Sequence, residues 1–220
     1  MTVQVPIDPE LLRVYVVTTS AFTGRSHADV VDAAIEGGAT AVQLRAPELP
    51  PHEVLLLARE LAPRCRAAGV RFLVNDLVDV AVAAGADGVH VGQGDAPARA
   101  RALLGRAAIL GISAASPEEA RAAEAAGADY LGVTVWGTAT KPEAAPGGLE
   151  GLRAVAEATR LPVVGIGGID ASNARHVVAA GAAGVAVVSA VGRAPDPVRA
   201  VRDLRAAVAE ALDPVRGGAR

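Results

Sequence analysis

Four passages of this chain share one pattern, in which an Ala-rich stretch runs into Gly-Ala and then into a short Val-rich segment. The passages begin at Gly38, Gly85, Gly127 and Gly181. Glycine is typical of a helix end, because it adopts the left-handed backbone conformation without a clash at Cβ. The alanines of the passages lie 47, 42 and 54 residues apart, about twice the length of one strand–helix unit. The spacing therefore predicts a (β/α)8 barrel in which every second unit carries the pattern.

Runs of branched residues, read as strands, alternate with Ala-, Glu- and Arg-rich periodic stretches, read as helices. Strands are expected at 14–18, 41–45, 71–75, 88–91, 109–113, 130–135, 163–166 and 184–188. Helices are expected at 28–36, 51–67, 78–83, 98–104, 117–125, 149–158, 173–179 and 198–212. The prediction is a single-domain α/β TIM barrel over 1–220, with 1–12 and 213–220 as terminal extensions. A doubly wound open sheet is the alternative, ranked lower because no candidate strand carries the charges or prolines typical of an edge.

Composition excludes several classes of protein. The chain has 220 residues, a net charge of −3 and a pI near 5.8 without a basic run, which argues against a nucleic-acid surface. The single Cys65 excludes a disulfide framework and is typical of a structural thiol in a reducing compartment. No apolar stretch reaches the length of a membrane span. We therefore expect a cytoplasmic protein with no membrane partner, whose apolar helix surface permits a homo-oligomer.

Polar residues and glycines follow most of the predicted strands. In a (β/α)8 barrel the carboxyl ends of the strands carry the chemistry, so these residues are the candidates for a functional site. The longest strand–helix connection, after the sixth strand, is also typical of a loop that closes a site. The candidates are Gln43, Arg45, Asn75, Asp76, Asp95, Ser113, Thr138, Thr140, Lys141, Gly167, Gly168 and Ser189.

Asp76 and Asp95 follow neighbouring strands and are expected to lie close together. Two converging carboxylates repel each other unless a cation or a proton lies between them. Oxygen ligands of this kind suit Mg²⁺, which takes one or two carboxylates together with phosphate oxygens. The alternative, equally weighted from these residues alone, is that each aspartate caps the helix that follows it.

A phosphate site is predicted after the last two strands, where Gly167 and Gly168 follow the seventh strand and Ser189 follows the eighth. Bare backbone N–H groups at the glycines can approach an anion closely, although glycines needed only for tight packing would look the same. Arg45 and Lys141 supply positive charge for a second anion beside the metal. His90, inside a strand, is interpreted as a hydrogen-bonded core histidine rather than a base.

Several motifs, in order from Val14 to Pro197, resemble thiamine phosphate synthase and its relative, the thiazole tautomerase. The resemblance implies that hydroxymethylpyrimidine pyrophosphate is joined to thiazole phosphate, both small phosphorylated substrates, with release of pyrophosphate. It is carried by Val42-Gln43-Leu44-Arg45, Asn75-Asp76, the run from Gly85 to Asp95, Thr138-Ala139-Thr140-Lys141, Gly148-Leu149-Glu150-Gly151-Leu152, Val164-Gly165-Ile166-Gly167-Gly168-Ile169 and Val187-Val188-Ser189-Ala190.

The resemblance also implies a role for each matching residue. Asp76 and Asp95 would hold Mg²⁺, and Gln43 and Asn75 would face the pyrimidine. Arg45, Ser113 and Lys141 would bind the pyrophosphate, and the thiazole phosphate would be bound by Thr138, Thr140, Gly168, Val188 and Ser189, beside the Gly167 already expected at a phosphate site.

The chain departs from the family pattern at several positions. Arg-x-Lys after the second strand reads Arg45-Ala46-Pro47, so one cation for the pyrophosphate is missing. Losing such a contact costs about 1.5–3 kcal/mol, which corresponds to about one to two orders of magnitude in rate. The family's Asn-Asp-Arg motif has Leu77 in place of its arginine. The family's Gly-Pro-aromatic-Pro run, in the loop after the sixth strand, is replaced by residues 134–137.

The tautomerase relative needs a histidine where this chain has Ala115. Synthase is therefore favoured, with a tautomerase-like isomerase and a non-catalytic barrel that binds phosphorylated ligands as the alternatives.

Overall fold

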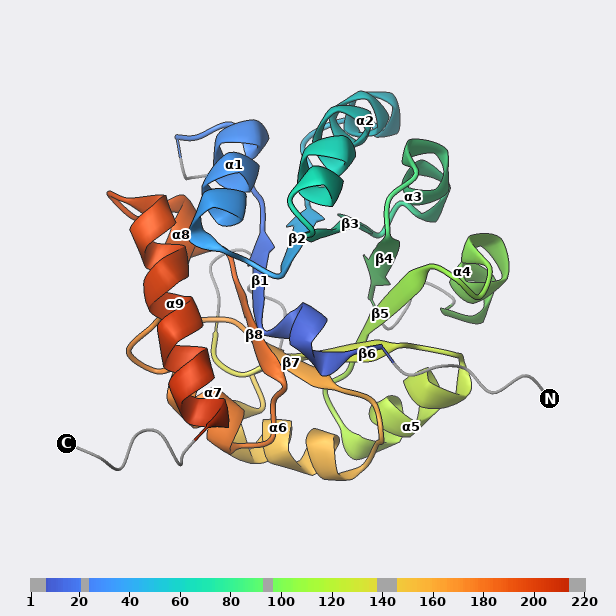
Figure 1. The fold of residues 1–220 in the computed structure, drawn as a ribbon. Coiled ribbons are helices and arrows are strands. Elements are labelled where there is room, and N and C mark those ends of the chain that lie inside the picture. Colours follow the sequence, from blue (N-terminus) through green and yellow to red (C-terminus); the bar gives the residue numbers. More distant parts are fainter. Residues whose placement is uncertain (1–6, 21–23, 93–96, 138–145, 214–220) are drawn as a thin grey trace.

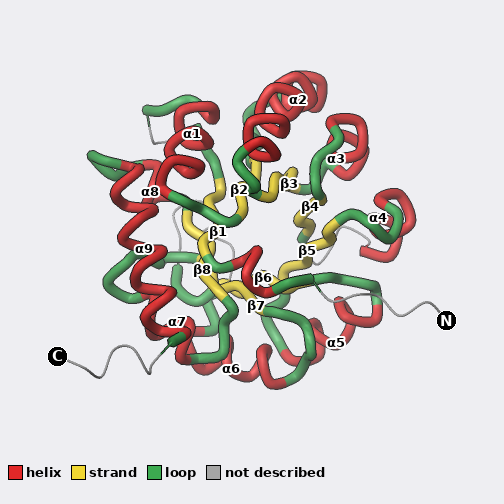
Figure 2. Tube along the Cα trace, viewed as in Figure 1, coloured by secondary structure: helices red, strands yellow, loops and turns green. Residues whose placement is uncertain are grey.

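The computed structural model describes residues 7–20, 24–92, 97–137 and 146–213, in which eight parallel strands form a closed barrel. Each strand pairs with its neighbour in sequence, and β1 pairs with β8. The helices surround this ring of strands (Figure 2). The predicted TIM barrel is confirmed, and the open-sheet alternative is wrong. The strands are β1 (Val14–Val17), β2 (Ala41–Leu44), β3 (Arg71–Asn75), β4 (Gly88–Val91), β5 (Ile109–Ser113), β6 (Tyr130–Thr134), β7 (Val163–Ile166) and β8 (Gly184–Val187).

The helices follow the expected order, with two short elements that the sequence did not indicate. These are the 3-10 helix η1 (Pro9–Leu12), before the first strand, and α8 (Ser189–Gly192), directly after the last one. The remaining helices are α1 (His27–Gly37), α2 (Pro51–Ala67), α3 (Val78–Ala84), α4 (Pro97–Leu104), α5 (Pro117–Ala125), α6 (Gly148–Glu157), α7 (Ala174–Ala179) and α9 (Pro197–Leu212).

The four Gly-Ala passages lie directly before β2, β4, β6 and β8, as the spacing predicted. Their glycines have φ angles of +84°, +65°, +87° and +106°, all in the left-handed region. At the first two passages the glycine is the C-cap of the helix, and at the other two it follows the C-cap. The repeat is therefore a helix-ending device that directs the chain into every second strand.

The residue after each Gly-Ala ties its strand to the preceding one. In all four passages its backbone N–H donates to a carbonyl oxygen at the start of that preceding strand: Thr40 to Val14 (2.9 Å), Asp87 to Phe72 (2.8 Å), Asp129 to Leu110 (2.8 Å) and Ala183 to Val163 (2.8 Å). In the first three, the side chain also accepts the N–H of the same strand residue, at 3.0, 2.9 and 2.7 Å. The polar third position of the repeat thus closes a two-bond clasp between neighbouring strand starts.

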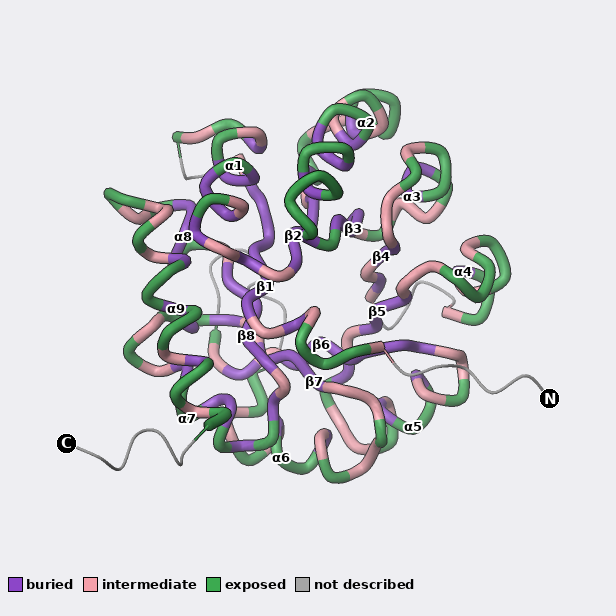
Figure 3. Tube along the Cα trace, viewed as in Figure 1, coloured by how far each residue is buried: buried purple, intermediate pink, exposed green. Residues whose placement is uncertain are grey.

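The core has two shells, because successive strand residues point to opposite faces. On β1, Val14 and Val16 pack outward against the helices, whereas Tyr15 and Val17 belong to the barrel interior. Figure 3 shows buried residues along the strands and exposed ones on the outer helix surfaces. Cys65 lies in the outer shell, where burial above all, with Asp87 and Asp32 adding to it, raises the pKa of its thiol to about 12. It is the expected structural thiol.

At one end of the barrel η1 lies across the opening (Figure 1), and its Leu12 is buried in the interior shell. The Asp8 carboxylate accepts the N–H of Glu10 at 2.9 Å and so starts this turn. Leu12, the last residue of the predicted extension 1–12, therefore contributes to the core. The division of the chain into one domain and two terminal extensions stays a prediction. No helix in the described ranges combines the length and the hydropathy needed to cross a bilayer.

Replacing Asp129 with Ala is expected to lower the free energy of unfolding by about 3 kcal/mol. The Asp129 carboxylate accepts from Arg101 at 2.5 Å and from the Leu110 N–H at 2.7 Å, and both side chains of the ion pair are largely buried. The substitution leaves a nearly buried guanidinium without its carboxylate and a strand N–H without an acceptor. Urea denaturation measures the change.

Asp87→Ala is the matched control, because it opens the same kind of clasp where the ion pair with Arg71 is more exposed. Asp87→Ala should lower the free energy of unfolding by less, about 1–2 kcal/mol. Equal losses in the two variants would contradict the role assigned to the buried guanidinium.

Candidate functional site

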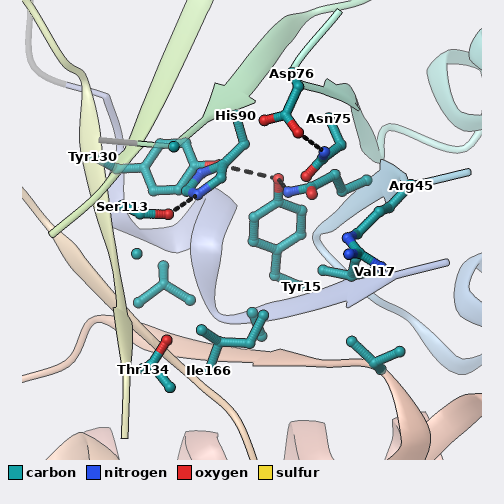
Figure 4. Close-up of a pocket in the computed structure, with 16 residues that line it drawn as sticks. Tyr15, Val17, Arg45, Asn75, Asp76, His90, Ser113, Tyr130, Thr134 and Ile166 are labelled. Carbon is teal, nitrogen blue, oxygen red and sulfur yellow. Dashed lines mark hydrogen bonds between the residues drawn. The ribbon is translucent and has the colours of Figure 1, made fainter. Parts of the chain in front are cut away.

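All eight strands contribute to one cavity of about 270 Å³. It lies at the carboxyl ends of the strands, the end opposite the clasps. Figure 4 shows the side chains that surround it. Its lining residues are Tyr15, Val17, Gln43, Arg45, Asn75, Asp76, His90, Gly92, Ser113, Tyr130, Gly132, Thr134, Val164, Ile166, Ala186 and Val188.

The strand register explains why these residues meet. Asn75 is paired with His90, and Ser113 with Gly132. Side chains alternate between the two faces of a strand, and two residues paired across a ladder lie on the same face. When one member of such a pair points into the barrel, its partner therefore points there too. Six of the residues predicted from sequence line the cavity. Three lie in strands, Gln43, Asn75 and Ser113, and three directly follow strands, Arg45, Asp76 and Val188.

Five side chains form a continuous hydrogen-bonded chain across the floor of the cavity (Figure 4). Gln43 Nε2 donates to the Tyr15 hydroxyl at 2.8 Å, and that hydroxyl lies 3.0 Å from the Tyr130 hydroxyl. His90 Nδ1 lies 2.9 Å from the Tyr130 hydroxyl, and His90 Nε2 lies 3.1 Å from Ser113 Oγ. His90 is therefore hydrogen-bonded at both ring nitrogens, as expected, but it also lines the cavity.

The two tyrosines have no counterpart among the predicted site residues. Burial raises the pKa of Tyr15 to about 12, and burial, with the nearby Tyr15 and Asp129 adding to it, raises the pKa of Tyr130 well above its usual value. Both phenols therefore stay protonated in any neutral solution. A Cβ built on Gly111 would lie 2.2 Å from the Tyr130 ring, so this glycine leaves the space that the ring occupies.

Asp76 lies at the mouth of the cavity in a left-handed backbone conformation, with φ of +61°. Its N–H donates to the His90 carbonyl oxygen at 2.8 Å, and its carboxylate accepts from Asn75 Nδ2 at 2.6 Å. The helix that follows has Leu77 as its N-cap, with no side-chain cap bond. The alternative that Asp76 caps this helix is wrong.

The oxygen donors at this mouth fit a hard cation. Mg²⁺ is usually held by one or two carboxylates, with water and phosphate oxygens completing the set, and the exposed Asp76 carboxylate meets that requirement. In the part of the chain that the structure describes, no three His, Cys, Asp or Glu side chains are grouped as metal ligands. Asp95, the second predicted ligand, lies outside the described residues.

Arg45 is fixed at its backbone by a cluster that sequence reasoning missed. Its N–H donates to Thr18 Oγ1 at 3.2 Å, and this hydroxyl lies 2.7 Å from Nδ1 of the buried His27. His27 Nε2 lies 3.1 Å from the carboxylate of Glu48, to which Ser20 also donates. Partial burial works against ionisation of Glu48, but the hydrogen bonds from Ser20 and His27 outweigh it and hold its pKa below the usual range.

Gly167 and Gly168, expected to bind a phosphate, have φ of +95° and +64° and do not line the described cavity. A Cβ on Gly167 would lie 2.4 Å from the Trp136 carbonyl oxygen, so the glycine is needed for packing. Asn173 Nδ2 holds the Gly168 carbonyl oxygen at 2.9 Å. Within the described ranges no hydrogen bond reaches either glycine N–H, so both remain available to an anion.

The remaining predicted site residues lie outside the described cavity or outside the described residues. Ser189 is exposed as the first residue of α8 and does not line the described cavity. Thr138, Thr140 and Lys141 lie outside the described residues. At Ala115, where the tautomerase relative has its histidine, the backbone N–H donates to the Glu119 carboxylate at 2.7 Å.

Comparisons with known proteins agree with this architecture. A family model described as thiamine monophosphate synthase matches residues 14–191. The thiamine-phosphate synthase of Moorella thermoacetica is 51% identical over 199 residues, covering 89% of this chain and 95% of that protein. That of a Roseiflexus species is 50% identical over 204 residues, covering 91% and 86%.

Among solved structures, a thiamine phosphate pyrophosphorylase from Pyrococcus furiosus superposes with a TM-score of 0.86 at 41% identity. The superposition covers 93% of this chain and 98% of that one. The family match extends over most of the barrel, and about half of the aligned residues are shared with the Moorella and Roseiflexus proteins. The chain therefore belongs to the thiamine monophosphate synthase family.

Proposed function

We propose that this cavity is the active site of a thiamine phosphate synthase, a cytoplasmic enzyme that joins hydroxymethylpyrimidine pyrophosphate to thiazole phosphate. The observation that carries the proposal is the meeting of Gln43, Arg45, Asn75, Asp76 and Ser113 in one cavity at the carboxyl ends of the strands. These residue types provide amides for a heteroaromatic ring, a cation and a hydroxyl for phosphate oxygens, and a carboxylate for a divalent ion. Each half of the pyrimidine substrate thus has partners of suitable chemistry.

The reaction requires groups that stabilise the departing pyrophosphate, and it requires no general base. In this proposal Arg45, Ser113 and Lys141 bind the pyrophosphate oxygens, while Gln43 and Asn75 orient the pyrimidine ring. The thiazole nitrogen carries its own lone pair, so no side chain has to remove a proton to make it nucleophilic. Preorganised donors aimed at the leaving group lower the barrier, because charge develops there as the carbon–oxygen bond breaks.

The thiazole phosphate is assigned to the other side of the same opening, after the carboxyl ends of β7 and β8. The left-handed Gly167 and Gly168 offer two N–H groups, while Asn173 fixes the carbonyl of Gly168. Backbone donors of this kind are a common phosphate site in barrels. Its proposed members are Gly167, Gly168, Val188 and Ser189, together with Thr138 and Thr140.

Mg²⁺ is proposed as the cofactor, with Asp76 and Asp95 as its ligands. When bound, a divalent ion would neutralise pyrophosphate charge as the bond breaks. Asp76 is suited to this position because the turn after β3 presents its carboxylate at the cavity mouth, beside Asn75.

A direct test mixes the purified protein with both substrates and Mg²⁺ and follows the appearance of thiamine phosphate and pyrophosphate. The proposal expects both products in equal amounts. Binding of either substrate without turnover would instead identify a ligand-binding barrel and reject the proposed enzyme.

Asp76→Asn is expected to lower the rate by about 10- to 100-fold and to raise the Mg²⁺ concentration needed for half-maximal rate. Asparagine tolerates the left-handed conformation that this position requires, so the substitution removes the charge and keeps the turn. Initial rates of thiamine phosphate formation, measured across a Mg²⁺ titration, give both quantities.

Asp79→Asn is the matched control, because Asp79 is an exposed carboxylate three residues further along, in the first turn of α3. It should leave the Mg²⁺ dependence unchanged. If Asp76→Asn kept full activity in EDTA, the metal assignment would be wrong.

Pro47→Lys is expected to raise the rate by up to about tenfold. Pro47 is exposed, two residues after Arg45, at the position where the family pattern has a lysine for the pyrophosphate. Steady-state kinetics with the pyrimidine substrate measure the change, mainly as a lower KM. Pro47→Gln is the control, since it removes the ring without adding a charge. If both variants gain equally, loop flexibility and not charge is responsible.

A further inference from the structure

The chain of hydrogen bonds across the cavity floor gives every one of its groups a partner in one direction only. The amide nitrogen of Gln43 can only donate, so the Tyr15 hydroxyl accepts from it at 2.8 Å. Tyr15 has one proton, and its hydroxyl is buried, so this proton is donated to the Tyr130 hydroxyl at 3.0 Å; in the opposite direction it would have no acceptor among the described hydrogen bonds. Tyr130 in turn donates its own proton to His90 Nδ1 at 2.9 Å.

This direction determines the tautomer of His90. A neutral imidazole has one nitrogen that accepts and one that donates, so accepting at Nδ1 places the proton on Nε2. His90 Nε2 then donates to Ser113 Oγ at 3.1 Å. Because Ser113 Oγ accepts this bond, its own proton is left to be donated elsewhere, and Ser113 lines the cavity.

We propose that Gln43, Tyr15, Tyr130 and His90 form a directional relay that holds Ser113 as a hydrogen-bond donor to an anionic phosphate oxygen in the cavity. The proposal rests on the proposed function, which places a pyrophosphate there. Tyr15, Tyr130 and His90 act in it as positioning residues, since they determine the orientation of the Ser113 hydroxyl.

The surroundings of the relay keep its direction fixed. Both tyrosine rings are buried, and raised pKa values keep both phenols protonated. The Tyr130 ring packs edge-on against Tyr15 with centroids 6.1 Å apart, and its centroid lies 5.5 Å from that of His90 (Figure 4). No buried side-chain nitrogen or oxygen in the described chain lacks a hydrogen-bond partner. Reversing one bond would leave two donors or two acceptors facing each other.

The relay makes a specific contribution to anion binding. A hydroxyl that can rotate freely presents either its proton or its lone pairs to a phosphate, and only the proton is attracted. A Ser113 hydroxyl whose lone pair is already engaged by His90 meets the anion in the favourable orientation. Hydrogen bonds to charged acceptors are stronger than neutral ones, so the orientation is expected to affect pyrophosphate affinity.

Nitrogen-15 NMR of the histidine rings tests the direction without using activity. The chain has four histidines, and the His90 signals are identified by their loss in His90→Gln. The expected result at neutral pH is an unprotonated Nδ1 and a protonated Nε2 in the wild-type protein. In Tyr130→Phe, which removes the donor to Nδ1, this preference should weaken. A protonated Nδ1 in the wild-type protein would overturn the relay.

A double-mutant cycle tests whether the relay acts through Ser113. Calorimetric titration with inorganic pyrophosphate and Mg²⁺ should show about three- to tenfold weaker binding for Tyr130→Phe and for Ser113→Ala. Adding Tyr130→Phe to Ser113→Ala should cause no further loss, because the hydroxyl being oriented is gone. Losses that multiply would mean that the tyrosine acts independently, and the proposal would be rejected.

Thr40→Val is the control for removal of a hydroxyl. It deletes a half-buried hydroxyl that bonds Val14 at the opposite end of the barrel, so it should leave pyrophosphate affinity unchanged. If the wild-type protein bound no pyrophosphate, the proposed function would fail, and the NMR result would still decide the relay.

Discussion

Pairing of β1 with β8 closes the sheet, and every functional feature of this molecule depends on that closure. A closed parallel barrel brings eight carboxyl strand ends around one opening, although the residues concerned are spread from Tyr15 to Val188 in sequence. Closure also creates an interior that must be filled. Here Leu73 and the two tyrosines fill its centre, and polar side chains appear above them towards the opening.

The two ends of the strands carry different tasks. At their amino ends, Thr40, Asp87 and Asp129 bind the first residues of neighbouring strands and so set the register. At their carboxyl ends, the same register brings Asn75 opposite His90. A substitution among the clasps therefore acts on stability first, whereas one at the opening acts on binding and chemistry.

The sequence predicted the fold closely, because the helix ends are marked by glycine and the strands by branched residues. The limits of β3, β4, β5 and β7 agree with the expected ones, and the other four strands end one residue earlier. The four-residue elements η1 and α8 were missed, since a segment of that length has no periodicity that could reveal it. After most strands, a polar residue or glycine could be predicted as a site residue without knowledge of its contacts.

The interior of the site was less accessible to such reasoning. Tyr15 and Tyr130 lie inside strands, where an aromatic residue is typical of ordinary core. Only the register shows that their hydroxyls meet each other and His90. Likewise, the left-handed backbone of Asp76 and the contact of His27 with Thr18 depend on loop geometry, which residue types alone do not determine.

One departure from the internal repeat changes how two neighbouring strand starts are joined. In the fourth Gly-Ala passage the third position is Ala183, so the seam between β7 and β8 has the main-chain bond of the clasp but lacks its side-chain half. Among the four seams that carry the repeat, this one therefore has the fewest clasp bonds. The rim directly above it carries the glycine turn after β7 and the start of α8. The two turns proposed to hold the thiazole phosphate thus stand above the one seam of the repeat that is joined by the main chain alone.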